Sequence, residues 1–133
     1  MSDAGAKANR PLSPHLQIYR WPLTMVVSIA HRVTGVGLYL GMALLAWWLA
    51  AVAAGEAYFN FVNAIFTSWI GLVILFGFTW ALVHHMLGGL RHFVWDFGYG
   101  LTAPARNRLA LANIVLSIVI TVLLWIIGLG LRG

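Results

Sequence analysis

Long apolar stretches constrain this chain more than any other feature of its sequence. No Asp, Glu, Lys or Arg occurs from Val33 to Gly55 or from Ala57 to Leu90, and a third apolar stretch follows Arg108. A helix that spans a bilayer needs about 20 apolar residues. Charged residues make up only 8% of the 133 residues, whereas a soluble domain has about 25%. The sequence therefore predicts an all-α integral membrane protein with three transmembrane helices, at about 23–53, 64–92 and 107–128.

The segments outside these helices are polar or contain glycine and proline. We expect residues 1–22 to form a polar, interfacial segment, since the prolines at 11 and 14 exclude a regular helix. Residues 23–133 then form one three-helix transmembrane domain. Residues 57–63 are expected to be a loop or interfacial, because 57–90 is too long for one untilted span. Glycines favour a turn at 96–100, and 102–108 is expected to be a short connecting loop.

The basic residues gather on one side of the predicted membrane. Seven of the eight precede or begin the first helix or lie between the second and third, and only Arg132 lies on the other side. The positive-inside rule then places the N-terminus in the cytoplasm or matrix. Residues 1–10 lack the apolar region of a signal peptide and have too little arginine for a transit peptide. We therefore expect a bacterial inner membrane, with the mitochondrial inner membrane as the less favoured alternative.

Composition also excludes some kinds of chemistry. The chain has no cysteine, so it cannot supply a disulfide or an iron–sulfur cluster by itself. Its net charge of +5 does not indicate nucleic-acid binding, because the basic residues are grouped by membrane side. Candidate functional residues are therefore sought among the ionisable side chains within or beside the helices.

Three of the five histidines lie between His84 and His92, at the end of the second predicted helix. Ionisable residues kept inside a membrane are candidates for a functional site. His85 and His92 are seven residues apart and share a helix face with Gly88 and Gly89, which leave space for a flat group such as a porphyrin. His84 points about 100° away. Close helix packing or a proton relay would account for the same residues.

A second polar cluster lies in the first turns of the first predicted helix. Ser28, His31 and Arg32 are spaced so that they share one helix face. Together they could hydrogen-bond a quinone carbonyl or neutralise haem propionates, although Arg32 could instead reach the lipid headgroups. Asp96 could either pair with Arg91 or supply protons to a site just inside the membrane. Both clusters are expected at the same membrane face.

The third predicted helix has a single polar stripe. Asn113, Ser117 and Thr121 follow one another at intervals of four residues. We expect this stripe to face another helix rather than lipid.

Three ordered motifs resemble the family of cytochrome b subunits of succinate dehydrogenase, the larger membrane anchors of respiratory complex II. The motifs are Arg10–His15, Ser28–Gly35 and His84–His92, the last followed by Asp96–Tyr99. The resemblance covers nearly the whole chain in order.

The resemblance implies a heterodimeric helix bundle in which this chain and a small anchor subunit each supply one histidine to a single haem b. In the family the ligand lies seven residues before the histidine of an Arg-His pair, which corresponds to His85, with His84 as the alternative. The family's quinone-site serine and arginine correspond to Ser28 and Arg32. Its contacts to haem propionates correspond to His31 and Arg32.

The implied activity is that of a non-flavin subunit of succinate dehydrogenase, which is not catalytic alone. A flavoprotein subunit oxidises succinate, an iron–sulfur subunit passes the electrons on, and ubiquinone is reduced in the membrane. Two alternatives remain open at this stage: an anchor of a fumarate reductase-type quinol oxidoreductase, and a non-haem structural membrane anchor.

Overall fold

The fold is a helical bundle with three helices long enough to cross a membrane. A computed structural model describes residues 19–131, so most of the predicted interfacial segment lies outside the described residues. The helices of this part are α2 (Leu23–Ala54), α3 (Glu56–Thr67), α4 (Trp69–Asp96) and α5 (Ala103–Gly130). By length and apolar composition α2, α4 and α5 could each span a bilayer. The predicted all-α fold with three membrane helices is confirmed.

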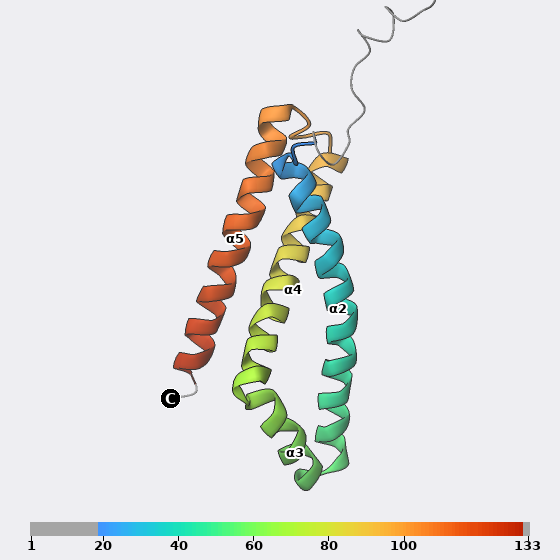
Figure 1. The fold of residues 1–133 in the computed structure, drawn as a ribbon, viewed down its shortest axis with the longest axis vertical. Helices are drawn as coiled ribbons and strands as arrows, with labels where there is room; N and C mark the ends of the chain where they lie inside the picture. The colour runs from blue at the N-terminus through green and yellow to red at the C-terminus, as the bar shows by residue number, and fades with distance from the viewer. Residues whose placement is uncertain (1–18, 132–133) are drawn as a thin grey trace, which may run out of the picture.

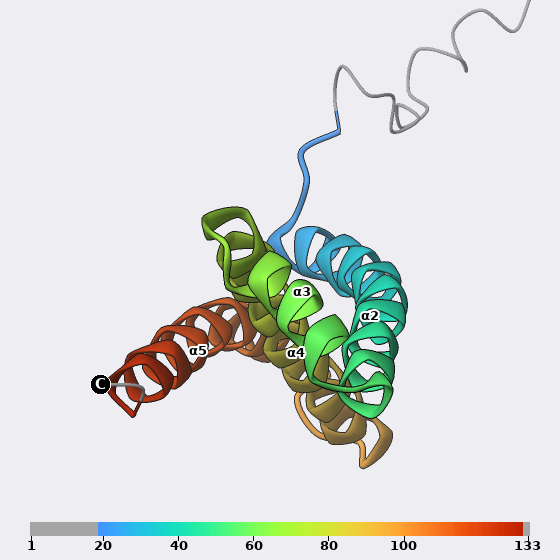
Figure 2. The ribbon, with the colours of Figure 1, turned by 90° about the horizontal axis from the view of Figure 1, so that it is seen from below.

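Helix α4 is the central helix and lies between α2 and α5 (Figures 1 and 2). The start of α2, the end of α4 and the start of α5 meet at one end of the bundle, called here the polar end (Figure 1). Helix α3 lies at the opposite end. Because the chain passes from one end to the other three times, the two polar clusters of the sequence come together at the polar end.

The prediction of a loop as one option for residues 57–63 is wrong, because these residues belong to α3. Gly55 has a φ of 106°, which favours glycine and reverses the chain after α2. Helix α3 then folds back on the end of α2, where Trp48 packs against Phe59 and Trp47 against Phe66, at ring-centroid distances of 5.8 and 5.9 Å. Aromatic packing against α2 therefore stabilises this segment as a helix.

The first helix has nearly its predicted bounds, whereas the starts of α4 and α5 differ from expectation. Helix α4 begins after Ser68, whose hydroxyl accepts a hydrogen bond from Gly71 N at 3.1 Å. It ends at Asp96, and Gly98 and Gly100 form the expected turn with φ of 81° and 71°. Helix α5 begins at Ala103 rather than at about residue 107, so the predicted loop at 102–108 is wrong for all but its first residue; Pro104 is tolerated in a first helical turn.

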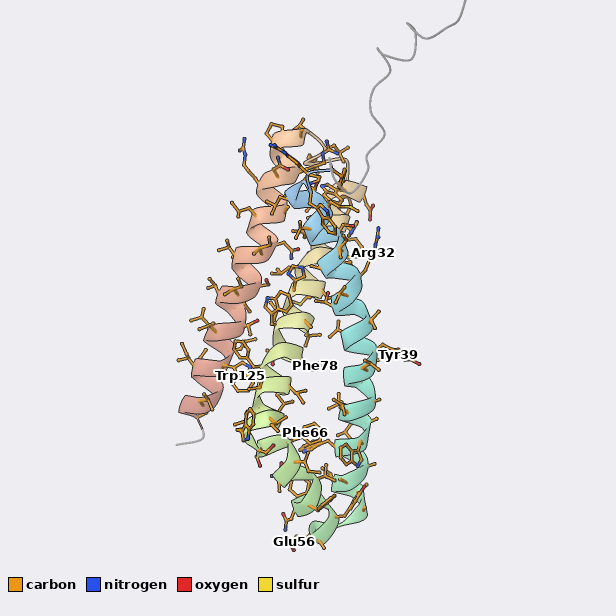
Figure 3. The ribbon with its side chains drawn as sticks, viewed as in Figure 1. Arg32, Tyr39, Glu56, Phe66, Phe78 and Trp125 are labelled. Carbon is orange, nitrogen blue, oxygen red and sulfur yellow. The ribbon has the colours of Figure 1, made fainter. Side chains whose placement is uncertain are left out.

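The helix interfaces are formed mainly by small and polar residues. Phe78 of α4 projects toward α2, where Gly41 has no side chain to obstruct it (Figure 3). Trp125 of α5 donates a hydrogen bond to Thr79 Oγ1 of α4 at 3.2 Å. The predicted stripe on α5 is buried, with Asn113, Ser117 and Thr121 at most 4% exposed. Its expected position against another helix is confirmed, as small and polar contacts favour helix association in lipid.

Candidate functional site

The polar end holds a cluster of aromatic and basic side chains from α2 and α4. His31 of α2 lies against His85 of α4 with their rings stacked, 3.9 Å between centroids and 8° from parallel. The His92 ring lies 5.7 Å from the His31 ring and packs edge-on against Trp95. The sequence-predicted residues His31, His85 and His92 are therefore brought together.

A backbone hydrogen bond fixes the orientation of His85. Its Nδ1 lies 3.0 Å from the carbonyl oxygen of His31. Because a carbonyl can only accept, Nδ1 carries the proton and donates it, so neutral His85 has its lone pair on Nε2. Thr34 Oγ1 lies 3.4 Å from the same Nδ1 and donates to the same carbonyl at 2.9 Å.

Two glycines let the two histidines approach each other. A Cβ at Gly88 of α4 would clash with the His31 ring, and a Cβ at Gly35 of α2 would lie 3.0 Å from Cε1 of His85. Gly89 by contrast has open space beside it. Only Gly88 of the predicted glycine pair is therefore needed for the contact between α2 and α4, which agrees with close packing at small residues.

The geometry of His85 fits an axial ligand of haem iron. Histidines that bind a metal usually donate their second ring N–H to a carbonyl or carboxylate, as Nδ1 does here. Within residues 19–131 its Nε2 has no hydrogen-bond partner and is not among the fully buried polar atoms. His85 thus presents an available lone pair at the surface of α4.

His84 has a different environment, between α4 and α5. It is 1% exposed. Asn113 Nδ2 lies 3.2 Å from His84 Nδ1 and 3.4 Å from the His84 carbonyl oxygen, and Ser117 Oγ lies 3.3 Å from Nδ1. The amide donates to both acceptors, so Nδ1 of His84 holds the lone pair and Nε2 the proton. This Nε2 is also buried and has no partner among the described residues, so neither ring nitrogen is open to a ligand outside the bundle in this arrangement.

Arg91 and Trp95 continue the buried stripe of α4. Arg91 is 6% exposed, and its guanidinium carbon lies 5.0 Å from the centroid of the Trp95 ring. Arg91 Nε and Trp95 Nε1 are buried without a hydrogen-bond partner among the described residues. Because Arg91 stacks on this ring and Asp96 is exposed, the alternative of an Arg91–Asp96 pair finds no support here.

The remaining predicted residues lie around this cluster. Ser28 of α2 lines a cavity of about 360 Å³ together with Arg91, His92 and other residues of the polar end. Arg32 is exposed and lies on the outer side of α2, away from α4 (Figure 3). Ser28 and Arg32 are therefore at the same level of the bundle but do not line the same cavity within this chain.

Sequence reasoning missed three features of the site. These are the buried position of Arg91, the contact of Trp95 with it, and the role of Thr34 beside His85. Heptad spacing could have indicated the first two, since positions 84, 88, 91 and 95 fall on one helix stripe. Thr34 lies three residues after His31 and could have been assigned to the same face.

Comparison with known proteins agrees with this architecture. The family model "Succinate dehydrogenase/Fumarate reductase transmembrane subunit" matches residues 6–124. The succinate dehydrogenase cytochrome b556 subunit of Paracoccus denitrificans is 44% identical over 127 residues, which cover 96% of this chain and 97% of that protein. The corresponding subunit of Rickettsia felis is 38% identical over 117 residues, covering 88% of this chain and 91% of the relative.

A mitochondrial protein is also similar. The succinate dehydrogenase cytochrome b560 subunit of Sus scrofa is 34% identical over 119 residues, which cover 86% of this chain and 69% of that protein. These matches extend over all three membrane helices. From the family match and the three-helix fold together, the chain belongs to the family of succinate dehydrogenase/fumarate reductase transmembrane subunits.

Proposed function

We propose that this chain is the cytochrome b membrane anchor of a bacterial succinate dehydrogenase, with its N-terminus in the cytoplasm. In this function it holds one haem b together with a small anchor subunit and forms the site where ubiquinone is reduced. The flavoprotein and iron–sulfur subunits supply the electrons from succinate. Relatives named as succinate dehydrogenase cytochrome b subunits favour this assignment.

The observation that carries the proposal is the hydrogen bond from His85 Nδ1 to the His31 carbonyl. It holds the ring in the tautomer and orientation in which Nε2 can bind iron. The bond between two helices also ties the position of the ligand to the packing of α2 on α4. A haem bound there supplies a carrier for one electron at a time.

The residues around His85 would hold the propionates of the haem. His31 Nδ1 is buried against Gly88, so His31 would reach a propionate through Nε2, and Arg32 is an exposed cation one residue further on. Both can interact with the carboxylates of haem propionates. His84 is the less favoured ligand, since its Nδ1 is an acceptor for Asn113.

Ser28 and Arg32 are the proposed residues for ubiquinone. The Ser28 hydroxyl and the Arg32 guanidinium can each donate a hydrogen bond to a quinone carbonyl, which gains negative charge on reduction. Arg32 is exposed on α2, so it is free to meet a quinone held between this chain and another subunit. Asp96, exposed at the end of α4, is the proposed route for protons at the same membrane face.

A fumarate reductase-type anchor is the second candidate, because the family description includes both enzymes. The haem and quinone residues would then be the same, and only the direction of electron flow would differ. A structural anchor without haem is the third, and it would leave the His85 Nε2 lone pair without a role.

A visible spectrum of the purified complex tests the haem assignment. We expect a reduced-minus-oxidised difference spectrum with the α-band of one b-type haem per complex. A complex that is complete in its four subunits but has no such band would contradict the proposal and favour the structural anchor.

Kinetics with two electron acceptors test the quinone assignment. In Ser28→Ala and Arg32→Ala we expect ubiquinone reduction to fall by about tenfold or more, as expected for loss of a charge-assisted hydrogen bond. Succinate oxidation with an artificial acceptor that takes electrons from the soluble subunits should remain. Unchanged quinone kinetics in both variants would show that the site lies elsewhere.

A further inference from the structure

The cavity at the polar end has a composition that the haem and quinone assignments do not explain. It has a volume of about 360 Å³ and lies where α2 begins, α4 ends and α5 begins. Its lining residues are Thr24, Ser28, Arg91, His92, Trp95, Leu101 and Arg106. All but Leu101 carry a hydrogen-bond donor or can carry one, and none of these residues is acidic.

Arg91 is the central feature of this cavity. Its side chain is 6% exposed, and its Nε is buried with no partner among residues 19–131. Trp95 Nε1, which can only donate, is buried beside it and is likewise without a partner in that range. An arginine that is almost fully buried and has no acidic partner among the described residues is costly. Such a group calls for an acceptor that is not supplied by residues 19–131.

The second arginine and the start of α5 add to the positive charge. Arg106 lies in the first turn of α5, and Thr102 caps this helix without a side-chain hydrogen bond. The first N–H groups of a helix carry a partial positive charge and favour anions. Two arginines thus line one cavity, one of them buried, and α5 begins close to it, two residues after the lining residue Leu101.

We propose that this cavity binds the phosphate of an anionic membrane phospholipid, such as phosphatidylglycerol or cardiolipin. Basic pockets between membrane helices at the cytoplasmic face are suited to such headgroups. Leu101, which lines the cavity, is 57% exposed and offers an apolar contact for an acyl chain. This inference is independent of haem ligation, although the cavity shares Ser28 with the proposed quinone site.

Lipid binding to the intact, delipidated complex tests this proposal. Native mass spectrometry would follow titration with phosphatidylglycerol, with phosphatidylcholine and with inorganic phosphate. The wild-type complex should bind phosphatidylglycerol saturably, and the other two at least about tenfold more weakly. In Arg91→Gln the affinity for phosphatidylglycerol should fall by about tenfold or more, as expected for loss of a charge-assisted contact. Arg106→Gln should weaken it less.

Arg108→Gln is the matched control, because Arg108 is an exposed arginine of α5 that does not line the cavity. It should bind the lipid as the wild type does. Equal binding by wild type and Arg91→Gln, or a wild type that does not prefer phosphatidylglycerol, would overturn the proposal. Inorganic phosphate that binds as tightly as the lipid would instead indicate a soluble anion.

Two further measurements separate the remaining explanations. If Arg91→Gln loses haem while its lipid binding stays at the wild-type level, the anion is a haem propionate and the lipid proposal is wrong. If the Arg91→Gln complex does not assemble, lipid binding by the Arg106→Gln and Arg91→Lys complexes tests the proposal instead. Arg91→Lys keeps the charge and should retain most of the lipid binding. The difference spectrum of wild type reports separately on the proposed function.

Discussion

The two adjacent histidines of α4 have opposite environments. His84 faces α5, is 1% exposed and accepts a hydrogen bond from Asn113 through Nδ1. His85 faces α2, is partly exposed and donates through Nδ1 to the His31 carbonyl. One step along a helix turns the side chain by about 100°. Neighbours in sequence are therefore assigned to different interfaces, one structural and one with an available ligand atom.

The difference shows how one helix can carry both a scaffold and a site. The contacts of His84 with Asn113 fix the rotation of α4 relative to α5. Because the backbone is rigid, the same contacts determine where His85 points. His84 is thus expected to act on packing, and His85 on cofactor binding.

The largest expected effect separates the two histidines. His85→Ala should abolish the b-type α-band of the purified complex, because it removes the proposed iron ligand. His84→Ala should retain the band and instead lower the thermal stability, by about 1–3 kcal/mol, because it leaves the Asn113 amide without its acceptor. The measurements are the difference spectrum and the thermal unfolding of each complex. Loss of the band only in His84→Ala would reverse the assignment.

The second effect separates the two glycines beside His85. Gly88→Ala should weaken the packing of α2 on α4 by about 1–3 kcal/mol, because the new Cβ meets the His31 ring. Gly89→Ala is the matched control, since nothing lies within 4 Å of its Cβ position. Thermal unfolding and haem content should both fall in the first variant only. Equal behaviour of the two variants would mean that α2 and α4 do not pack through Gly88.

The sequence predicted the membrane helices and the separation of the two histidines, because hydropathy and helix periodicity are local properties. It also predicted that the Asn113 stripe would face a helix. It did not identify α3, since the aromatic contacts that hold this helix come from the end of α2 and form only because the chain reverses at Gly55.

The site could be predicted only in part for a similar reason. His85 was singled out by its spacing from His92 and by resemblance, but the bond to the His31 carbonyl depends on how two helices pack. The burial of Arg91 was missed because this arginine, near a helix end, was considered only as a partner of Asp96. Its heptad relation to His84 was a better guide than its distance from the end of the helix.

A smaller effect is expected in a double-mutant cycle that tests the structural role of His84. In a double-mutant cycle of His84→Ala and Asn113→Ala, the losses of stability should not add, with a coupling of about 0.6–1.7 kcal/mol as measured for polar pairs between membrane helices. Combining His84→Ala with Thr121→Ala is the control, because Thr121 Oγ1 donates to the Ser117 carbonyl rather than to His84. Strict additivity in the first cycle would show that Asn113 does not hold His84.

The smallest expected effect is a change in the hydrogen bond of His85 Nδ1 and, through it, in the haem midpoint potential. Thr34 Oγ1 donates to the Ala30 and His31 carbonyls, at 2.8 and 2.9 Å, so it competes with His85 Nδ1 for the second one. Thr34→Val removes the competing donor with little change of shape. The His85 bond should then strengthen, make Nε2 a more basic ligand and lower the haem midpoint potential slightly.

Redox titration of the complex would measure this shift, with stability changed by less than about 1 kcal/mol. Ser117→Ala is the matched change on the other face of α4, since the Ser117 hydroxyl contacts His84 rather than His85. It should leave the midpoint potential unchanged. A shift in Ser117→Ala as large as that in Thr34→Val would mean that the two faces of α4 are not independent, and that His84 reaches the haem through the rotation of the helix.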